Sequence, residues 1–298
     1  MMSFATMLWL FAFKIKKIQG YDRVIIQSPP LPVAGSAITL FKKIFGRKTL
    51  VNISDLWPLS AVELGAMREG GKIYDIFAWI ERYIYRNADG IFGQSEEIIR
   101  HVNQFPSTKN KFVYRNLQQY AVAAQPKRKH TPFRIVYAGL LGVAQDIYSI
   151  IENIPFQSIG AEFHLYGGGN QTEKIKEYIN KHPGCFVYYH GYVKKEQIAE
   201  ELSRYDASIV PLTVAIKGAV PSKIYDLIPI GIPILFCGGG EGAEIVSKYY
   251  FGMVSKPHDF KQLHNNIIEL INLPDEEYST ISLSLIHISE PTRRSYIS

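Results

Sequence analysis

The sequence predicts an α/β protein with two halves, each built on a parallel sheet. Strand-length apolar runs alternate with helix-length amphipathic segments along most of the 298 residues, as in strand–helix–strand units. A stretch without clean periodicity, residues 118–132, separates two such series and contains Pro126-Lys127-Arg128-Lys129, a composition typical of linkers. Residues 221–242 contain a short helix pattern, a turn at Gly231, a buried strand pattern and a glycine loop. Glycine loops after parallel strands are places where ligands bind.

Size and composition support this fold class. The chain is long enough for two domains of ordinary size. Apolar residues make up 47% and charged residues 20%, which excludes disordered and collagen-like classes. The net charge of +6 favours anionic partners such as nucleotide phosphates or acidic lipid headgroups. Cys185 and Cys237 lie in unrelated strand contexts, so we expect no disulfide framework and a reducing, cytoplasmic location.

The first half is predicted to hold four strands, at residues 23–27, 49–53, 90–92 and 111–115, with helices at 1–13, 33–45, 73–86 and from 95. A nucleotide-type α/β domain usually has about six strands. We therefore expect an incomplete domain with an exposed sheet edge. In residues 1–13 the positive charges follow the apolar stretch, the reverse of a secretory signal. We interpret this stretch as an amphipathic helix lying inside the domain.

Two features of the first half suggest function. Asp55 follows a predicted strand at its carboxyl end, where ligands of α/β proteins bind; a helix or turn cap is the alternative. Lys42, Lys43, Arg47 and Lys48 end the second helix. They are either a solvated helix terminus favoured by the dipole or a contact with an anionic membrane, at roughly 1 kcal/mol per basic residue.

The second half is predicted to alternate regularly, with strands at 134–138, 162–166, 186–189, 207–211 and 232–236. The predicted helices cover 144–153, a segment ending at 179, 196–205, 222–228, 243–249 and 260–273. Glycine-rich loops follow three of the strands, at residues 139–142, 167–169 and 238–240. Backbone amides in such loops and at helix starts can hold a phosphate. Ser222 is expected to cap its helix, and Pro229 to end it early.

The segment from Pro221, P-S-K-I-Y-D-L-I-P-I-G-I-P-I-L, resembles the donor-sugar site of retaining GT-B glycosyltransferases of family 4. The branch that builds bacterial surface polysaccharides typically has P-S-K-[IL]-[YF]-E-Y-M-A-A-G-K-P-I-[LI]. Other stretches agree in order: residues 54–58, 137–139, 142–145 and 167–169. The resemblance covers about residues 22–273.

This resemblance implies a GT-B fold, with two Rossmann-like domains facing across a cleft and the first domain incomplete. We expect a partial acceptor-side domain at 1–117, a linker at 118–132 and a nucleotide-sugar-binding domain at 133–282. Residues 283–293 resemble the in-frame translation of a transposase adapter used in sequencing libraries. We therefore expect residues 283–298 to be an artefactual tail without consistent packing contacts.

The resemblance also assigns roles. Asp226 matches the second glutamate of a Glu-(seven residues)-Glu pair that binds the donor ribose, and Gly218 stands where the wider family has the first. Lys223 is expected to neutralise the donor diphosphate; the alternatives are a solvated carboxylate and a surface lysine. Asp55 resembles a cleft-facing catalytic residue. The complete donor-binding set is Pro221, Ser222, Lys223, Asp226, Gly139, Gly142, Gly168, Gly191, Val193, Gly240 and Glu241.

The implied activity is retaining transfer, without metal or cofactor, from a nucleotide-sugar such as a UDP-sugar. The acceptor would be a saccharide or a polyprenyl-diphosphate-linked sugar at the inner face of the plasma membrane, with the protein cytoplasmic or peripheral there. The alternatives are a GT-B nucleotide-sugar 2-epimerase and an inactive nucleotide-binding fragment. The histidines show no metal-ligand spacing and the chain has no P-loop. Residues 127–129 lack the interleaved aromatics of a nucleic-acid surface, so we expect no nucleic-acid partner.

Overall fold

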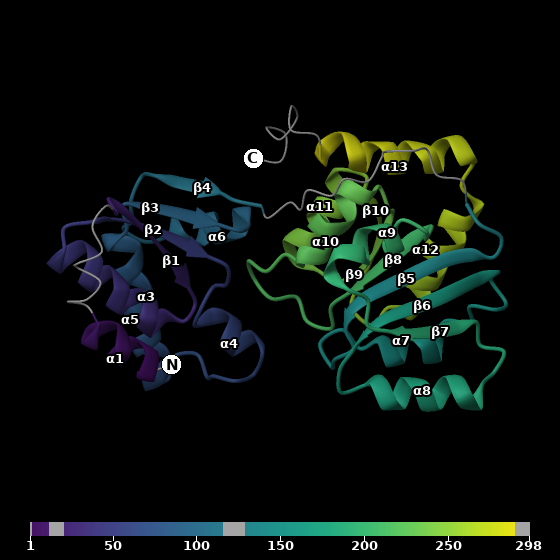
Figure 1. Cartoon of the computed structure of the whole chain (residues 1–298), viewed down its shortest axis with the longest axis horizontal. Coiled ribbons are helices and arrows are strands. Elements are labelled where there is room, and N and C mark those ends of the chain that lie inside the picture. Colours follow the sequence, from purple (N-terminus) through teal and green to yellow (C-terminus); the bar gives the residue numbers. More distant parts are fainter. Residues whose placement is uncertain (1, 12–20, 116–128, 290–298) are drawn as a thin grey trace. The chain divides into compact units, whose positions relative to one another are not determined.

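The computed structural model describes residues 2–11, 21–115 and 129–289 (Figure 1). The chain divides into two compact units. The first comprises Met1–Arg115 with Ile216–Val220, and the second comprises Asn116–Ala215 with Pro221–Ser298. Most of the predicted linker lies outside the described residues. Both units are built on parallel sheets with helices packed against them (Figure 1), which confirms the predicted α/β class.

The first unit contains a four-stranded parallel sheet in the order β1-β2-β3-β4. Its strands are β1 (Arg23–Ser28), β2 (Lys48–Ile53), β3 (Gly90–Gly93) and β4 (Lys111–Val113). All four were predicted within three residues. Because β1 is at the edge of this sheet, its outer side pairs with no strand in the described part of the chain.

The helices of the first unit are α1 (Met2–Leu10), α3 (Leu31–Ile38), the π-helix η1 (Thr39–Ile44), α4 (Leu59–Glu63), α5 (Lys72–Asn87) and α6 (Glu96–Val102). Buried aliphatic side chains of the sheet, including Val51 and Ile91, form one core with Ile38 of α3 and Ile84 of α5. The Ser95 side chain accepts a hydrogen bond from the Ile98 amide. It therefore caps α6, as predicted from the sequence.

Two expectations for this unit are wrong. The N-terminal helix was expected inside the domain, but Phe4 and Leu10 of α1 are 63% and 73% exposed. The buried face of α5 was expected to include Ile73, which is instead 63% exposed. Its buried residues are Ala78, Glu81, Ile84 and Tyr85. The helix is apolar on more than one side, so the periodicity did not identify the inner one.

The second unit contains a six-stranded parallel sheet in the order β10-β9-β8-β5-β6-β7. The strands are β5 (Phe133–Leu140), β6 (Ala161–Gly168), β7 (Val187–Gly191), β8 (Ala207–Pro211), β9 (Ile234–Cys237) and β10 (Gly252–Ser255). β10 was not predicted. Because β6 lies on one side of β5 and β8 on the other, the strand order reverses here. Ligands of open α/β sheets bind at the carboxyl edge beside such a switch point.

Helices cover this sheet (Figure 1). They are α7 (Ile147–Asn153), α8 (Thr172–Lys181), η2 (Lys195–Gln197), α9 (Ile198–Leu202), α10 (Ser222–Leu227), η3 (Ile228–Ile230), α11 (Gly240–Lys248), α12 (Phe260–Asn272) and α13 (Asp275–Ser289). Side chains of α7, α8 and α12 form one buried core with the central strands. α10 ends before Pro229, as predicted.

Three expectations for the second unit need correction. Ser222 does not cap α10, because it is the first helical residue and Pro221 occupies the cap position without a side-chain hydrogen bond. α7 begins three residues later than predicted, since Asp146 has a left-handed backbone (φ 43°). The expectation of an unpacked tail from residue 283 is wrong for its first part. α13 continues to Ser289, and Leu285 is completely buried, as are Tyr278 and Ser282 on the same helical face. Residues 290–298 lie outside the described residues.

Candidate functional site

The loops that follow β5 and β6 pack against each other backbone to backbone. The Leu141 amide donates to the Gly168 carbonyl (3.0 Å), and the Gln171 amide donates to the Leu141 carbonyl (3.0 Å). A Cβ atom on Gly167 would lie 1.9 Å from the Gly139 carbonyl oxygen. The glycine run is therefore required by this close approach, and it leaves bare backbone at the carboxyl edge of the sheet.

A hollow of about 380 Å³ opens beside these loops. Its lining is Ala138, Gly139, Leu140, Tyr166, Gly167, Gly168, Tyr192, Val193 and Ile198. Three predicted site residues, Gly139, Gly168 and Val193, are thus together in one place. Gly191 ends β7 immediately before the lining residue Tyr192. The volume is within the usual range for small-molecule sites.

Lys223 of α10 lies against the edge of this hollow. A Cβ atom on Gly139 would be only 2.6 Å from the Lys223 Nζ atom, and Nζ lies 5.2 Å from the centre of the Tyr137 ring. Burial lowers the pKa of Lys223, an effect that the Asp226 carboxylate opposes. Among the described residues, Nζ forms no hydrogen bond and no ion pair. Lys223 is therefore a desolvated cation close to bare backbone.

Asp226 lies on the same short helix. Its side chain is half-buried, and burial raises its pKa, whereas Lys223 and Lys195 lower it. No hydrogen bond to this carboxylate is formed by the residues that the structure describes. Asp226 can therefore accept hydrogen bonds from a ligand hydroxyl.

The remaining predicted donor residues do not line the hollow. Gly142 forms a turn whose carbonyl accepts from the Asp146 amide (3.0 Å). Pro221 and Ser222 begin α10, and Gly240 and Glu241 begin α11. A Cβ atom on Gly242 would be 3.3 Å from Pro221 Cδ, so the starts of these two helices are close. The Glu241 side chain is buried, with 5% exposed.

Asp55 belongs to the first unit, where it follows β2. It is half-buried, and burial raises its pKa. Its carboxylate has no hydrogen bond within the described ranges of the chain. α4 begins only at Leu59, with Pro58 at its cap position and no side-chain cap bond. Asp55 therefore does not cap this helix, which was the alternative to a functional role.

Gly218 also belongs to the first unit. Its amide donates to Glu97 Oε2 (2.7 Å), and its carbonyl accepts from Ser95 Oγ (2.8 Å). Its backbone is left-handed (φ 78°), and a Cβ atom would lie 2.9 Å from Ile98 Cγ1. A side chain here would be strained and crowded. This accounts physically for glycine at the position where the resemblance places a glutamate.

Sequence reasoning missed the aromatic side chains around the hollow. The Tyr166 ring stacks on His190, with centroids 4.7 Å apart, and its hydroxyl donates to Glu201 (2.6 Å). His190 in turn is 2.9 Å from His164, nitrogen to nitrogen. His190 is thus held in a side-chain stack. Only the alternation along β6 could have shown that Tyr166 and His164 lie on one face.

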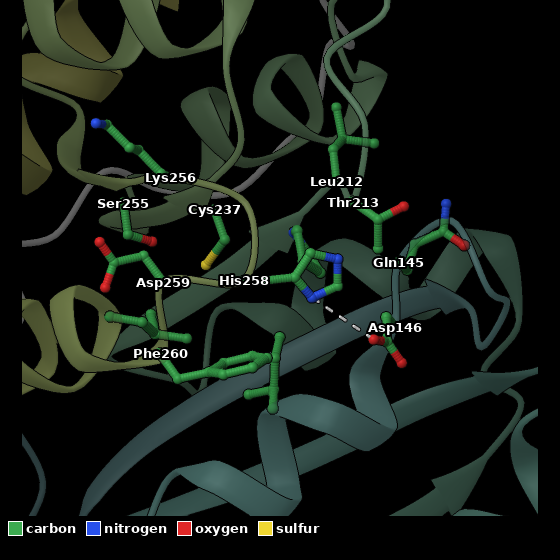
Figure 2. A pocket seen from close by; sticks show the side chains of 13 residues that line it. Gln145, Asp146, Leu212, Thr213, Cys237, Ser255, Lys256, His258, Asp259 and Phe260 are labelled. Atoms are coloured by element: carbon green, nitrogen blue, oxygen red, sulfur yellow. Dashed lines mark ion pairs between the residues drawn. The ribbon is translucent and has the colours of Figure 1, made fainter. Parts of the chain in front are cut away.

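A second pocket lies at the carboxyl edge of β8, β9 and β10 (Figure 2). Asp146, from the loop after β5, faces His258, from the loop after β10, at 3.9 Å. The pocket also contains the Cys237 thiol, whose pKa burial raises to about 12. Its volume of about 20 Å³ suits a single water molecule, so it is too small for a substrate.

Comparisons with known proteins agree with this arrangement. Residues 132–273, within the second unit, match the family described as "Glycosyl transferases group 1". No curated protein matches the chain. Several solved structures share the fold at low sequence identity.

Anabaena Alr3699/HepE in complex with UDP has a TM-score of 0.69 and 14% identity, over 95% of this chain and 77% of that one. The lipopolysaccharide outer core galactosyltransferase WaaB has 0.65 and 16%, over 97% and 76%. S. aureus TarM in complex with fondaparinux, alpha-GlcNAc-glycerol and UDP has 0.64 and 19%, over 97% and 57%. The chain thus spans 57% of the length of that TarM chain. The neighbours are GT-B glycosyltransferases. The protein therefore has the GT-B fold, and its second unit carries a glycosyltransferase group 1 domain.

Proposed function

We propose that this protein is a retaining glycosyltransferase of family 4 that takes a sugar from a nucleotide-diphosphate donor, specifically a UDP-sugar. The acceptor is a saccharide or a polyprenyl-diphosphate-linked sugar in cell-surface polysaccharide synthesis, at the cytoplasmic face of the membrane. The observation that carries the proposal is Lys223, a buried cation without a counter-charge beside a glycine loop. The relatives support the donor, since the HepE and TarM structures both contain UDP.

A buried ammonium without an ion-pair partner costs free energy in the unliganded protein. A diphosphate would remove that cost and also receive hydrogen bonds from the amides of the loops after β5 and β6. In the transfer, the bond between the anomeric carbon and the diphosphate oxygen breaks, and the oxygen keeps the electron pair. Lys223 stabilises the resulting charge on the leaving group. The proposal assigns this work to Lys223 and backbone amides and includes no metal or cofactor.

The two carboxylates have different roles in this proposal. Asp226 accepts hydrogen bonds from the ribose hydroxyls of the donor. Asp55 stabilises the positive charge that develops on the reacting sugar, or positions the acceptor. Both side chains are half-buried and lack hydrogen-bond partners among the described residues. Such carboxylates are more often retained for ligand binding than for stability.

Calorimetry with UDP and uridine tests the donor site. Lys223→Met should weaken UDP binding by about 10- to 100-fold, since a charged hydrogen bond contributes about 1.5–3 kcal/mol. It should leave uridine binding unchanged. Asp226→Asn should weaken both ligands. Lys248→Met is the matched control, because Lys248 is an exposed lysine of the same unit.

The apo protein provides a second readout. Because burial lowers the pKa of Lys223, the folded state binds this proton less tightly than the unfolded state. Lys223→Met should therefore raise the melting temperature at neutral pH, and the difference should shrink as pH rises toward the ordinary lysine pKa of about 10.4. Equal losses for UDP and uridine would remove diphosphate recognition from Lys223. UDP binding without UDP release to any saccharide acceptor would identify the inactive alternative.

A further inference from the structure

The outward side of α5 carries large apolar side chains. Ile73, Ile76 and Trp79 are 63%, 59% and 64% exposed, and their spacing places them along one side of the helix. The Trp79 ring stacks on Tyr83, with centroids 5.8 Å apart. We call Ile73, Ile76, Trp79 and Tyr83 the outer stripe. The side of α5 that faces the core is already packed, so the outer stripe is not needed to hold the first unit together.

Cations surround the outer stripe. Lys72, Arg82 and Arg86 of α5 are exposed. The Tyr83 hydroxyl is 2.9 Å from Thr39 Oγ1, which places η1 beside this part of α5. η1 contributes the exposed Lys43 and Ile44, and the exposed Arg47 follows it. Lys72, Arg86, Lys43 and Arg47 form no ion pair within the described ranges.

Lys42 differs from its neighbours. Its Nζ atom is 2.7 Å from Asp89, so its charge is already neutralised within the unit. The basic group around the outer stripe therefore includes Lys43 and Arg47 but excludes Lys42, although all three lie in one run of the sequence.

The charge of the whole unit has the same sign. The first unit contains 17 Lys and Arg against 9 Asp and Glu, a formal charge of +8, and the second contains 16 against 18, a formal charge of −2. The chain's net charge of +6 is thus entirely due to the first unit. A field of this sign attracts extended anionic surfaces.

We propose that the outer stripe of α5 lies on a membrane surface that contains anionic lipids. The indole and the isoleucines enter the boundary between headgroups and acyl chains, and Lys72, Arg86, Lys43 and Arg47 contact the lipid phosphates. This deepens the membrane part of the proposed function. It depends on no donor-site residue, so the two can fail separately.

Other occupants fit the surface less well. A nucleic acid would use the cations and could stack on Trp79, but exposed isoleucines add nothing to a phosphate backbone. A second copy, paired face to face, would bring identical cations together. A bilayer surface uses the apolar and the basic side chains at once. Within the described residues no helix is long and apolar enough to cross a membrane, and the proposed contact needs none.

Vesicle flotation with the full chain tests the proposal. The protein should bind vesicles of phosphatidylcholine with phosphatidylglycerol and bind pure phosphatidylcholine much less. The triple variant I73Q/I76Q/W79Q should reduce the bound fraction on the mixed vesicles about tenfold or more. The charge variant Lys43→Glu with Arg86→Glu should have a similar effect and abolish the salt dependence, since each basic residue contributes about 1 kcal/mol.

Matched controls come from the second unit. Tyr250→Ser removes an apolar side chain that is 77% exposed, and Lys261→Glu reverses an exposed charge. Both should bind vesicles like the parent. All variants should keep the parent's melting temperature and UDP affinity, which shows that they fold. Brominated lipid should quench the fluorescence of the parent more than that of Trp79→Phe.

Three results would overturn the proposal. The first is vesicle binding by the folded triple variant at the parent's level, or no binding by the parent to anionic vesicles. The second is binding of the parent to a nucleic-acid duplex but not to vesicles. The third is a parent dimer that the triple variant converts to a monomer, which would assign the outer stripe to a second copy. Loss of UDP binding alone would overturn only the donor site.

Discussion

The two units share an architecture but differ in where they place charge and apolar surface. Both are parallel sheets covered by helices. Of the 20 large apolar side chains that are exposed in the described chain, 14 belong to the first unit. The first unit also carries the whole positive net charge. Its free cations are on the outside, whereas the notable cation of the second unit, Lys223, is desolvated beside a glycine loop.

This difference indicates two ways of recognising an anion. A buried lysine beside bare backbone favours one small anion that can enter and replace lost hydration. Exposed cations around apolar side chains favour a broad surface, with each contact weak and screened by salt. The same fold class therefore serves a small ligand in one unit and an extended partner in the other. The following experiments test that division, beginning with the largest expected effect.

Replacing Asp55 in the first unit should affect turnover and not donor binding. Asp55→Asn should lower the transfer rate about 10²-fold or more, as expected for a lost charge-stabilising group, while UDP affinity stays at the parent's value. Turnover assays and calorimetry measure the two quantities. Asp75→Asn, at an exposed aspartate of the same unit, is the control and should change neither.

Stability provides an independent check on Asp55. Burial raises its pKa, so the ionised side chain destabilises the folded protein. This cost is absent below the ordinary aspartate pKa of about 3.9 and grows as pH rises through the raised value. Asp55→Asn should therefore be at least as stable as the parent at neutral pH. Full activity with a lower melting temperature would make Asp55 a structural residue.

Leu285 tests how far the second unit extends along the chain. Because this side chain is completely buried on α13, Leu285→Ala should lower the free energy of unfolding by about 2 kcal/mol. We choose the low end of the usual range because the residue is near the end of its helix. Ser284→Ala is the neighbouring control. Chemical denaturation that shows no difference between Leu285→Ala and the parent would restore the expectation of an unpacked tail.

The strands were the most predictable part of the fold, and the environment of single side chains the least. β8 was predicted to the residue because a run of five apolar and small residues between polar segments leaves little choice. The glycine loops were predicted because bare backbone is a property of the sequence itself. Ser95 was identified as a cap from its place before Glu96-Glu97.

The burial of Lys223 could not be predicted, because it depends on Gly139 and Tyr137 of a distant strand. The exposure of α1 and of the outer stripe failed for a related reason, since an apolar side chain shows no preference among several possible neighbours. The resemblance of the tail to adapter sequence concealed a local helix pattern in which Tyr278 and Leu285 share a face. The sequence thus predicted the backbone of the site better than the state of its charges.

A pair of aspartates makes the smallest and most direct test of the division between the units. Asp89 in the first unit receives hydrogen bonds from Lys42 (2.7 Å) and from the Thr49 amide (2.8 Å). Asp146 in the second unit receives one from the Gln171 side chain (2.9 Å), and so connects the two glycine loops. Burial alone would raise the pKa of each carboxyl, but these hydrogen bonds lower it overall. Each aspartate therefore stabilises the fold above its ordinary pKa, and this contribution is lost as pH falls through the lowered value.

Asp89→Asn should lower the free energy of unfolding at neutral pH by about 1 kcal/mol, with no change in UDP affinity, because its contacts hold only the first unit. Asp146→Asn should change stability less, since asparagine tolerates the left-handed backbone at this position (φ 43°). It should weaken UDP binding about two- to threefold, because the amide holds Gln171 less firmly than the carboxylate does. Melting curves at pH 7 and below pH 4, combined with calorimetry, separate these effects. If Asp89→Asn weakened UDP binding as much as Asp146→Asn, the donor site would depend on both units, and the division would fail.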